Sequence, residues 1–158
     1  MRPLFRPKAG LLPALCMAIL LSVGLPAGQA AASDPKPGHR LIIHVNENDP
    51  ARMNLALNNL TNVYEYYRTK NETVQVELVA YGPGLHIFRN DTSPVKQRIE
   101  SLKLAYETVT FSACGNTMKG MEKAEGKPLT LIDEVGVVPS GVIRILERQE
   151  EGWSYLRP

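Results

Sequence analysis

The chain has two cysteines among its 158 residues, and Cys114 is the one placed for chemistry. It follows an apolar, β-branched run that we expect to be a strand, and Gly115, Asn116 and Thr117 come directly after it. Gly115 permits a tight turn, and Asn116 or Thr117 can cap the helix expected next. Unpaired N–H groups at a helix N-terminus favour thiolate over thiol. The pattern predicts an exposed, acidified cysteine that attacks or accepts sulfur. The alternative is a buried cysteine that packs as an inert small side chain.

Two other residue types could assist this thiol. His44 lies near the end of the apolar run 41–45, and we expect it to approach Cys114 across adjacent strands. An imidazolium there would hold the thiolate as an ion pair, whereas the alternative is a core histidine with satisfied hydrogen bonds. Met118 lies four residues after Cys114, so these two sulfurs with His44 or His86 would suit Cu(I). The alternative for Met118 is core packing.

Motifs of common enzyme classes are missing from the sequence. The corner Gly82-Pro83-Gly84 lacks both the dinucleotide-binding glycine spacing and the P-loop lysine. Neither a Ser–His–Asp arrangement, nor HExxH, nor a paired-cysteine metal site is found. Asn46, Glu47 and Asp49 could orient a substrate, but a helix N-cap at Asp49 accounts for that residue equally well. We therefore expect neither a hydrolase nor a dinucleotide enzyme, and no cofactor.

The first 30 residues have the three parts of a secretory signal. A basic start (residues 2–8) precedes an apolar stretch (residues 11–25), and small residues follow at 27–32. The apolar stretch is shorter than the roughly 20 residues that a membrane span needs. We expect cleavage after Ala30 or Ala32, and hence a periplasmic or secreted protein. The alternative is an uncleaved anchor, which would be the protein's only membrane contact.

Removal of the signal changes the charge and cysteine counts. The chain has 18 basic and 16 acidic residues, and the first 30 residues hold three of the basic ones, which leaves 15 against 16. The basic excess therefore belongs to the signal and is no argument for a nucleic-acid partner. Cys16 would be lost too, leaving Cys114 unpaired. A single thiol in an oxidising compartment indicates an intermolecular disulfide, a guarded reactive group or an inert buried residue.

Apolar runs alternate with amphipathic segments along the rest of the chain. Strands are expected at 41–45, 74–81, 108–113, within 129–138 and at 153–156, and helices at about 50–67, 94–106, 116–124 and 139–151. This alternation predicts a three-layer α/β domain at 41–158, after a flexible leader at 31–40. Its five-stranded sheet should be mainly parallel, with helices on both faces. Ligands of such sheets lie outside the carboxyl ends of the strands, and Cys114 falls at one of those ends.

Four segments together resemble the DsrE/DsrF-like family over about residues 40–158. They are the run Phe111-Ser112-Ala113-Cys114-Gly115-Asn116-Thr117-Met118, the run Val138-Pro139-Ser140-Gly141-Val142, the end of the chain from Gln149 to Pro158, and the corner Gly82-Pro83-Gly84. The resemblance implies a parallel α/β sheet and oligomers, commonly trimers or hexamers. In some members a cysteine after the third strand carries sulfur as a persulfide, and Cys114 matches that position. Characterised sulfur-relay members are cytoplasmic, whereas the signal of this chain predicts export.

Three functional hypotheses follow. In the first, Cys114 is a persulfide carrier that receives sulfur from a donor and passes it to an acceptor protein. In the second, the chain is a non-catalytic oligomeric module that binds a small ligand, and in the third it binds copper. For the contact between copies we expect the apolar segment Leu85-His86-Ile87-Phe88.

Overall fold

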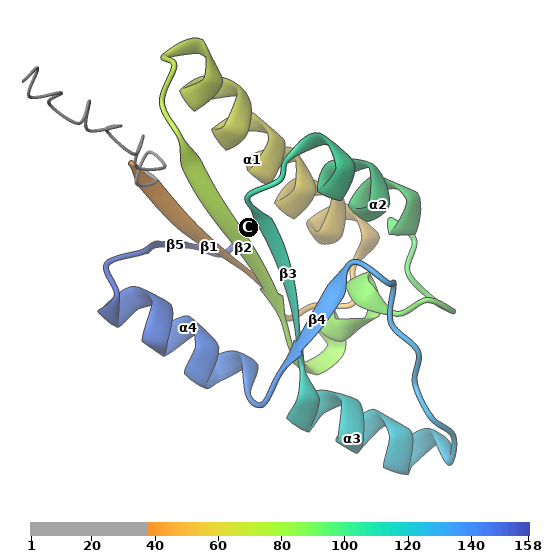
Figure 1. Ribbon diagram of the computed structural model, residues 1–158. Helices are drawn as coiled ribbons and strands as arrows, with labels where there is room; N and C mark the ends of the chain where they lie inside the picture. Colours follow the sequence, from red (N-terminus) through yellow and green to blue (C-terminus); the bar gives the residue numbers. More distant parts are fainter. Residues whose placement is uncertain (1–37) are drawn as a thin grey trace, which may run out of the picture. The chain divides into compact units, whose positions relative to one another are not determined.

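The computed structural model describes residues 38–158, so the predicted signal, its cleavage sites and most of the leader lie outside the described residues (Figure 1). The strands are β1 (His39–Val45), β2 (Val74–Ala80), β3 (Val109–Cys114), β4 (Val135–Val138) and β5 (Ser154–Leu156). The helices are α1 (Pro50–Thr69), the 3-10 helix η1 (Gly82–Phe88), α2 (Lys96–Ala105), α3 (Gly115–Glu125) and α4 (Gly141–Glu150). Within the described residues no helix is long and apolar enough to cross a membrane.

The strands form one sheet in the order β4-β3-β2-β1-β5, and every neighbouring pair is parallel. The predicted five-stranded parallel sheet is therefore confirmed. The central strand β2 is buried along almost its whole length, because helices cover both of its faces. Leu78, Val79 and Ala80 form a continuous apolar run because both faces are buried there, whereas the earlier part, from Val74 to Glu77, alternates apolar and polar residues.

Helices lie on both faces of the sheet, as predicted. Figure 1 shows α1 and α2 on one side and α4 on the other. The larger core cluster lies between the sheet and α1, α2 and η1, and includes Leu57, Leu78 and Phe111. The smaller cluster lies under α4 and consists of Ile42, Val79, Ile145 and Trp153. The α4 face therefore has little apolar packing, which leaves space there for polar side chains.

The segment after β2 differs from the prediction. Gly82-Pro83-Gly84 does not project as a corner but begins η1, in which Leu85, Ile87 and Phe88 are completely buried. A Cβ atom on Gly84 would lie 2.4 Å from the carbonyl oxygen of Val45, so only glycine lets the segment approach β1 this closely. The expected contact between copies at Leu85–Phe88 is therefore wrong, because these side chains belong to the core.

Candidate functional site

Cys114 is the last residue of β3 and the N-cap of α3. The predicted order of strand, cysteine and helix is confirmed, with the helix beginning at Gly115. A Cβ atom on Gly115 would lie 3.2 Å from the carbonyl oxygen of Val138 and 3.3 Å from a methyl carbon of Val137. The missing side chain therefore lets the first turn of α3 pack directly against β4.

The thiol is covered rather than exposed. Only 4% of Cys114 is accessible, so the prediction of an exposed cysteine is wrong for this chain. The cover is the first residue of α4, because a Cβ atom on Gly141 would lie 3.2 Å from the Cβ of Cys114 and 3.1 Å from the Tyr81 ring. Sequence reasoning missed this contact, since it joins residues of different βα units. The turn Pro139-Ser140-Gly141 was the only local indication of this contact in the sequence.

Hydrogen-bond donors surround the sulfur of Cys114. Burial by itself raises the pKa of the thiol, but the Thr117 hydroxyl and the backbone N–H groups of Gly141, Thr117 and Asn116 bring it below its ordinary value. The N–H groups of Asn116 and Thr117 belong to the first turn of α3, which is the effect predicted from a helix N-terminus. Gly141 adds a donor from α4. The direction of the predicted pKa change is thus confirmed, although the thiol is buried.

Two hydrogen bonds fix the first turn of α3. The backbone N–H of Gly82 donates to the Thr117 hydroxyl oxygen at 3.0 Å, and the N–H of Asn116 donates to the Pro139 carbonyl at 3.2 Å. The Thr117 hydroxyl therefore accepts from Gly82 and also contributes to the lowered pKa of the thiol. Gly115, Asn116 and Thr117 thus all lie at the cysteine, as the sequence predicted.

His44 does not reach Cys114. The two residues lie on β1 and β3, and β2 runs between these strands, so the expectation of adjacent strands is wrong. The His44 ring is buried, stacks on Tyr81 with 4.5 Å between ring centroids, and places Nδ1 2.8 Å from the Tyr155 hydroxyl. Burial and the charge of Arg157 lower the pKa of His44 to about 4. His44 is therefore neutral near pH 7 and provides no imidazolium for the thiolate.

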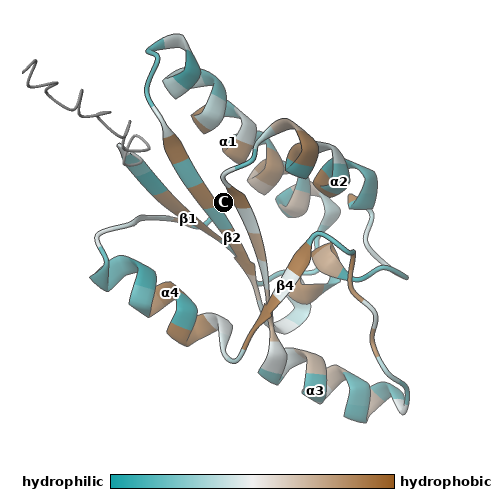
Figure 2. Cartoon of the chain, viewed as in Figure 1, coloured by the Kyte–Doolittle hydropathy of each residue, from teal (hydrophilic) through white to brown (hydrophobic). Residues whose placement is uncertain are grey.

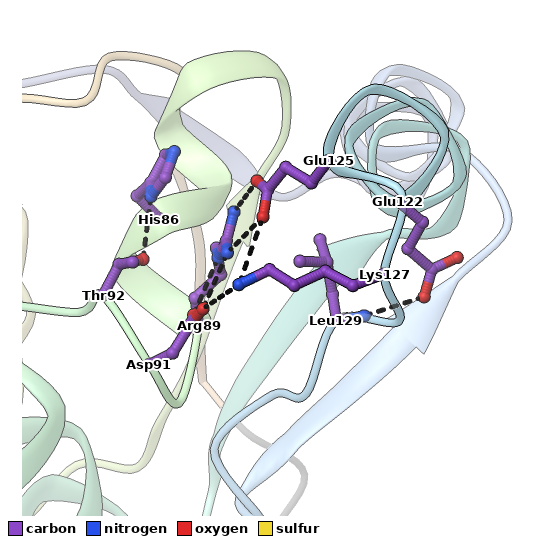
Figure 3. Close-up of polar contacts among 8 residues, drawn as sticks. All are labelled: His86, Arg89, Asp91, Thr92, Glu122, Glu125, Lys127 and Leu129. Carbon is purple, nitrogen blue, oxygen red and sulfur yellow. Dashed lines mark hydrogen bonds and ion pairs between the residues drawn. The ribbon is translucent and has the colours of Figure 1, made fainter.

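The other expected copper ligands have partners of their own in the structure. Met118 packs against the larger core cluster, on the sheet face opposite α4. His86 lies in η1, where its Nδ1 is 2.8 Å from the Thr92 hydroxyl (Figure 3). Among residues 38–158, no group of three or more His, Cys, Asp or Glu side chains could hold a metal ion. His44, which β2 separates from Cys114, is therefore excluded from the expected copper site.

The polar residues after β1 have structural partners. The Asp49 side chain accepts from the N–H of Ala51 at 2.8 Å, so it is the N-cap of α1. Glu47 pairs with Arg157 at 2.9 Å and more weakly with Arg52 at 3.9 Å. These contacts account for Asp49 and Glu47 without a substrate.

Figure 3 shows a second polar cluster, at the far end of α3 from the thiol. The Arg89 guanidinium is almost completely buried and binds both carboxylate oxygens of Asp91 and of Glu125. Lys127 lies 3.6 Å from Asp91 and 3.7 Å from Glu125. Since α3 has no fully buried residue, this cluster anchors its C-terminal end and helps to hold its N-terminus at Cys114.

Together, the fold and the site define a small parallel α/β protein with one acidified thiol, held at the start of the helix after the third strand. The chain belongs to the DsrE/DsrF-like family, whose model matches residues 39–158. The family is associated with sulfur relay. The resemblance noted in the sequence is thus confirmed.

The solved structures that are similar to this chain include two proteins of unknown function. A protein of unknown function, MTH1491 from Methanobacterium thermoautotrophicum, is 36% identical with a TM-score of 0.64, over 76% of this chain and 99% of that one. A conserved protein of unknown function, BT1422 from Bacteroides thetaiotaomicron, is 15% identical with a TM-score of 0.53, over 80% of this chain and 100% of that one. The second likeness concerns the fold alone. No curated protein gives a significant match.

Proposed function

We propose that the protein is an exported sulfur carrier that holds sulfane sulfur as a persulfide on Cys114. The observation that carries this proposal is the place of Cys114 at the end of β3 and at the N-terminus of α3, where the Thr117 hydroxyl and nearby backbone N–H groups bring the pKa of the thiol below its ordinary value. Thiolate, and not thiol, is the nucleophile in sulfur exchange, so a lowered pKa increases the reactive form near pH 7. Export rests on the predicted signal.

The chemistry needs no cofactor. The Cys114 thiolate attacks a sulfane sulfur of a polysulfide donor, and a bond forms between Sγ and that sulfur. The sulfur–sulfur bond of the donor breaks, and its electron pair leaves on the departing sulfur anion. An acceptor thiolate then attacks the outer sulfur, which releases the Cys114 thiolate unchanged. The N–H and O–H donors stabilise the anionic sulfur at the start and at the end of this cycle.

We propose further that the protein assembles with copies of itself, as a trimer or hexamer, through α4 and the edge strand β4. The outward side of α4 carries Val142, Ile143 and Leu146, each about half exposed, and β4 adds the exposed Val137. Figure 2 shows apolar residues on the part of α4 nearest β4. The free edge of β4 would leave a row of unpaired backbone groups beside this apolar surface. A second copy is the occupant that the family resemblance favours.

Mass spectrometry of the Cys114 peptide tests the carrier function. After incubation of the reduced native protein with polysulfide and capping with iodoacetamide, we expect a mass increase of one sulfur atom on this peptide. The Cys114→Ser variant is the matched control, and it should fold but carry no adduct. A folded wild-type protein without the adduct contradicts the proposal. Copper retention without an adduct would then favour the copper-binding hypothesis. If neither an adduct nor bound copper is found, the small-ligand-binding module is the remaining hypothesis. N-terminal sequencing of the native protein tests export, which a mature chain beginning at Met1 would contradict.

A further inference from the structure

The helix α4 turns a largely polar stripe toward the sheet. Residues spaced three and four apart lie on the same side of a helix, and Gly141 and Ile145 are the buried ones here. The inward stripe consists of Gly141, Arg144, Ile145 and Arg148, whereas Val142, Ile143 and Leu146 point outward. Apolar contact with the sheet is thus confined to the small cluster around Ile145. The position of α4 must therefore depend on its two inward arginines.

Both arginines bind one buried carboxylate. Glu77 lies in the middle of β2 with 0% of its surface accessible, and its oxygens accept hydrogen bonds from Arg144 Nε at 2.8 Å and Arg148 Nε at 2.6 Å. The Ser112 hydroxyl donates a third hydrogen bond at 2.6 Å. Burial raises the pKa of Glu77, but these three donors together bring it below its ordinary value. A buried ion pair of this kind resists separation, because removal of one partner leaves an uncompensated charge.

The Glu77–Arg144 pair lies one helical turn from the cover of the thiol. Arg144 follows Gly141 by three residues on the same side of α4, and Gly141 packs directly against Cys114, where its N–H also helps to lower the pKa of the thiol. We propose that Glu77 is a positioning residue that acts through Arg144 to hold the first turn of α4 closed over Cys114. Reagents then reach the thiol when this turn opens. The role of this closure in sulfur transfer rests on the proposed function, but the closure itself does not.

The rate of thiol alkylation in native protein tests this proposal. The measurement is made with iodoacetamide above the titration midpoint of Cys114 in each variant, so that the thiolate fraction is equal. A pKa change of one unit then alters the rate by only about threefold through nucleophilicity, and a larger change reports access. Glu77→Gln and Arg144→Met should each raise the alkylation rate by at least about tenfold. This corresponds to a decrease of about 1.4 kcal/mol in the free energy that favours the closed first turn of α4. The double variant should be no faster than the faster single variant, because both changes break the same link.

Glu65→Gln is the matched control. Glu65 also holds an arginine, Arg68, and a Tyr106 hydroxyl, but it lies near the opposite end of β3 from Cys114. Its loss should leave the alkylation rate unchanged. Circular dichroism shows whether each variant is folded. If Glu77→Gln does not fold, Arg144→Lys replaces it, since this change keeps the charge but loses the guanidinium geometry.

The urea dependence separates local opening from global unfolding. Opening of one helical turn predicts an accelerated rate that stays flat in urea below the unfolding transition. A folded Glu77→Gln variant with the wild-type rate overturns the proposal, and so does a rate that rises with urea along the slope of global unfolding. Polysulfide labelling of the wild type is scored separately. Faster alkylation in Glu77→Gln without any wild-type adduct would refute the carrier function and keep the positioning role of Glu77. A wild-type adduct with an unchanged alkylation rate in Glu77→Gln would refute the positioning role and keep the carrier function.

Discussion

Thr117→Val is the most direct test of how the protein lowers the pKa of its thiol. The change keeps the shape of the side chain but removes the hydroxyl group that donates to Cys114 and accepts from Gly82. A hydrogen bond to a charged group contributes about 1.5–3 kcal/mol. Because about 1.4 kcal/mol corresponds to one pKa unit, the loss should raise the pKa of the thiol, and at pH values below the titration midpoint it should reduce the thiolate population by about tenfold to a hundredfold.

The alkylation rate should fall by less than the thiolate population. A more basic thiolate is also the stronger nucleophile, with a Brønsted coefficient of about 0.4–0.5 that recovers nearly half of the logarithmic loss. The net decrease in the alkylation rate below the titration midpoint is therefore about threefold to tenfold. The N–H of Gly82 also loses its acceptor in Thr117→Val, so the free energy of unfolding should drop by about 1 kcal/mol.

Ultraviolet absorbance of the thiolate against pH provides the assay, with the alkylation rate measured in parallel. Thr117→Ser is the control, because it retains a hydroxyl at the same position and should titrate close to the wild type. A folded Thr117→Val protein whose titration midpoint equals that of the wild type would refute the reasoning. The backbone N–H groups of α3 and Gly141 would then account for the lowered pKa by themselves.

Two further predictions concern acid stability and assembly. The pKa of His44 is lowered to about 4 in the folded chain from 6.5, so between these values the unfolded chain binds more protons and stability falls as the pH falls. His44 changes the free energy of unfolding by at most about 1.4 kcal/mol per pH unit. The His44→Phe variant should lack this contribution when urea unfolding is measured between pH 4 and pH 7. For assembly, Leu146→Asp places a charge on the outward side of α4 and should shift the mass measured by light scattering toward the monomer. Leu104→Asp, a change at an exposed residue of α2, is its control, and equal masses for both variants would exclude α4 as the interface.

The sequence by itself determined the elements and their order. Strand and helix periods are local properties, so the apolar run at 41–45 predicted β1, and the cap Asp49-Pro50 with the apolar stripe after it predicted α1, each to within a few residues. Parallel connections then placed Cys114 at the carboxyl end of β3, ahead of a helix. The lowered pKa of the thiol followed from that local placement, because most of its donors lie within three residues of Cys114.

Only the tertiary structure decided what surrounds the thiol. The strand order inserts β2 between His44 and Cys114, and no local pattern encodes which strands become neighbours. Glu77 is a charged residue inside a mostly apolar strand, and its arginine partners Arg144 and Arg148 lie 67 and 71 residues away on α4. Gly141 covers Cys114 because that same ion pair draws α4 onto the sheet with its polar stripe inward. Contacts between residues far apart in the chain depend on how whole elements pack, and local periodicity carries no information about that packing.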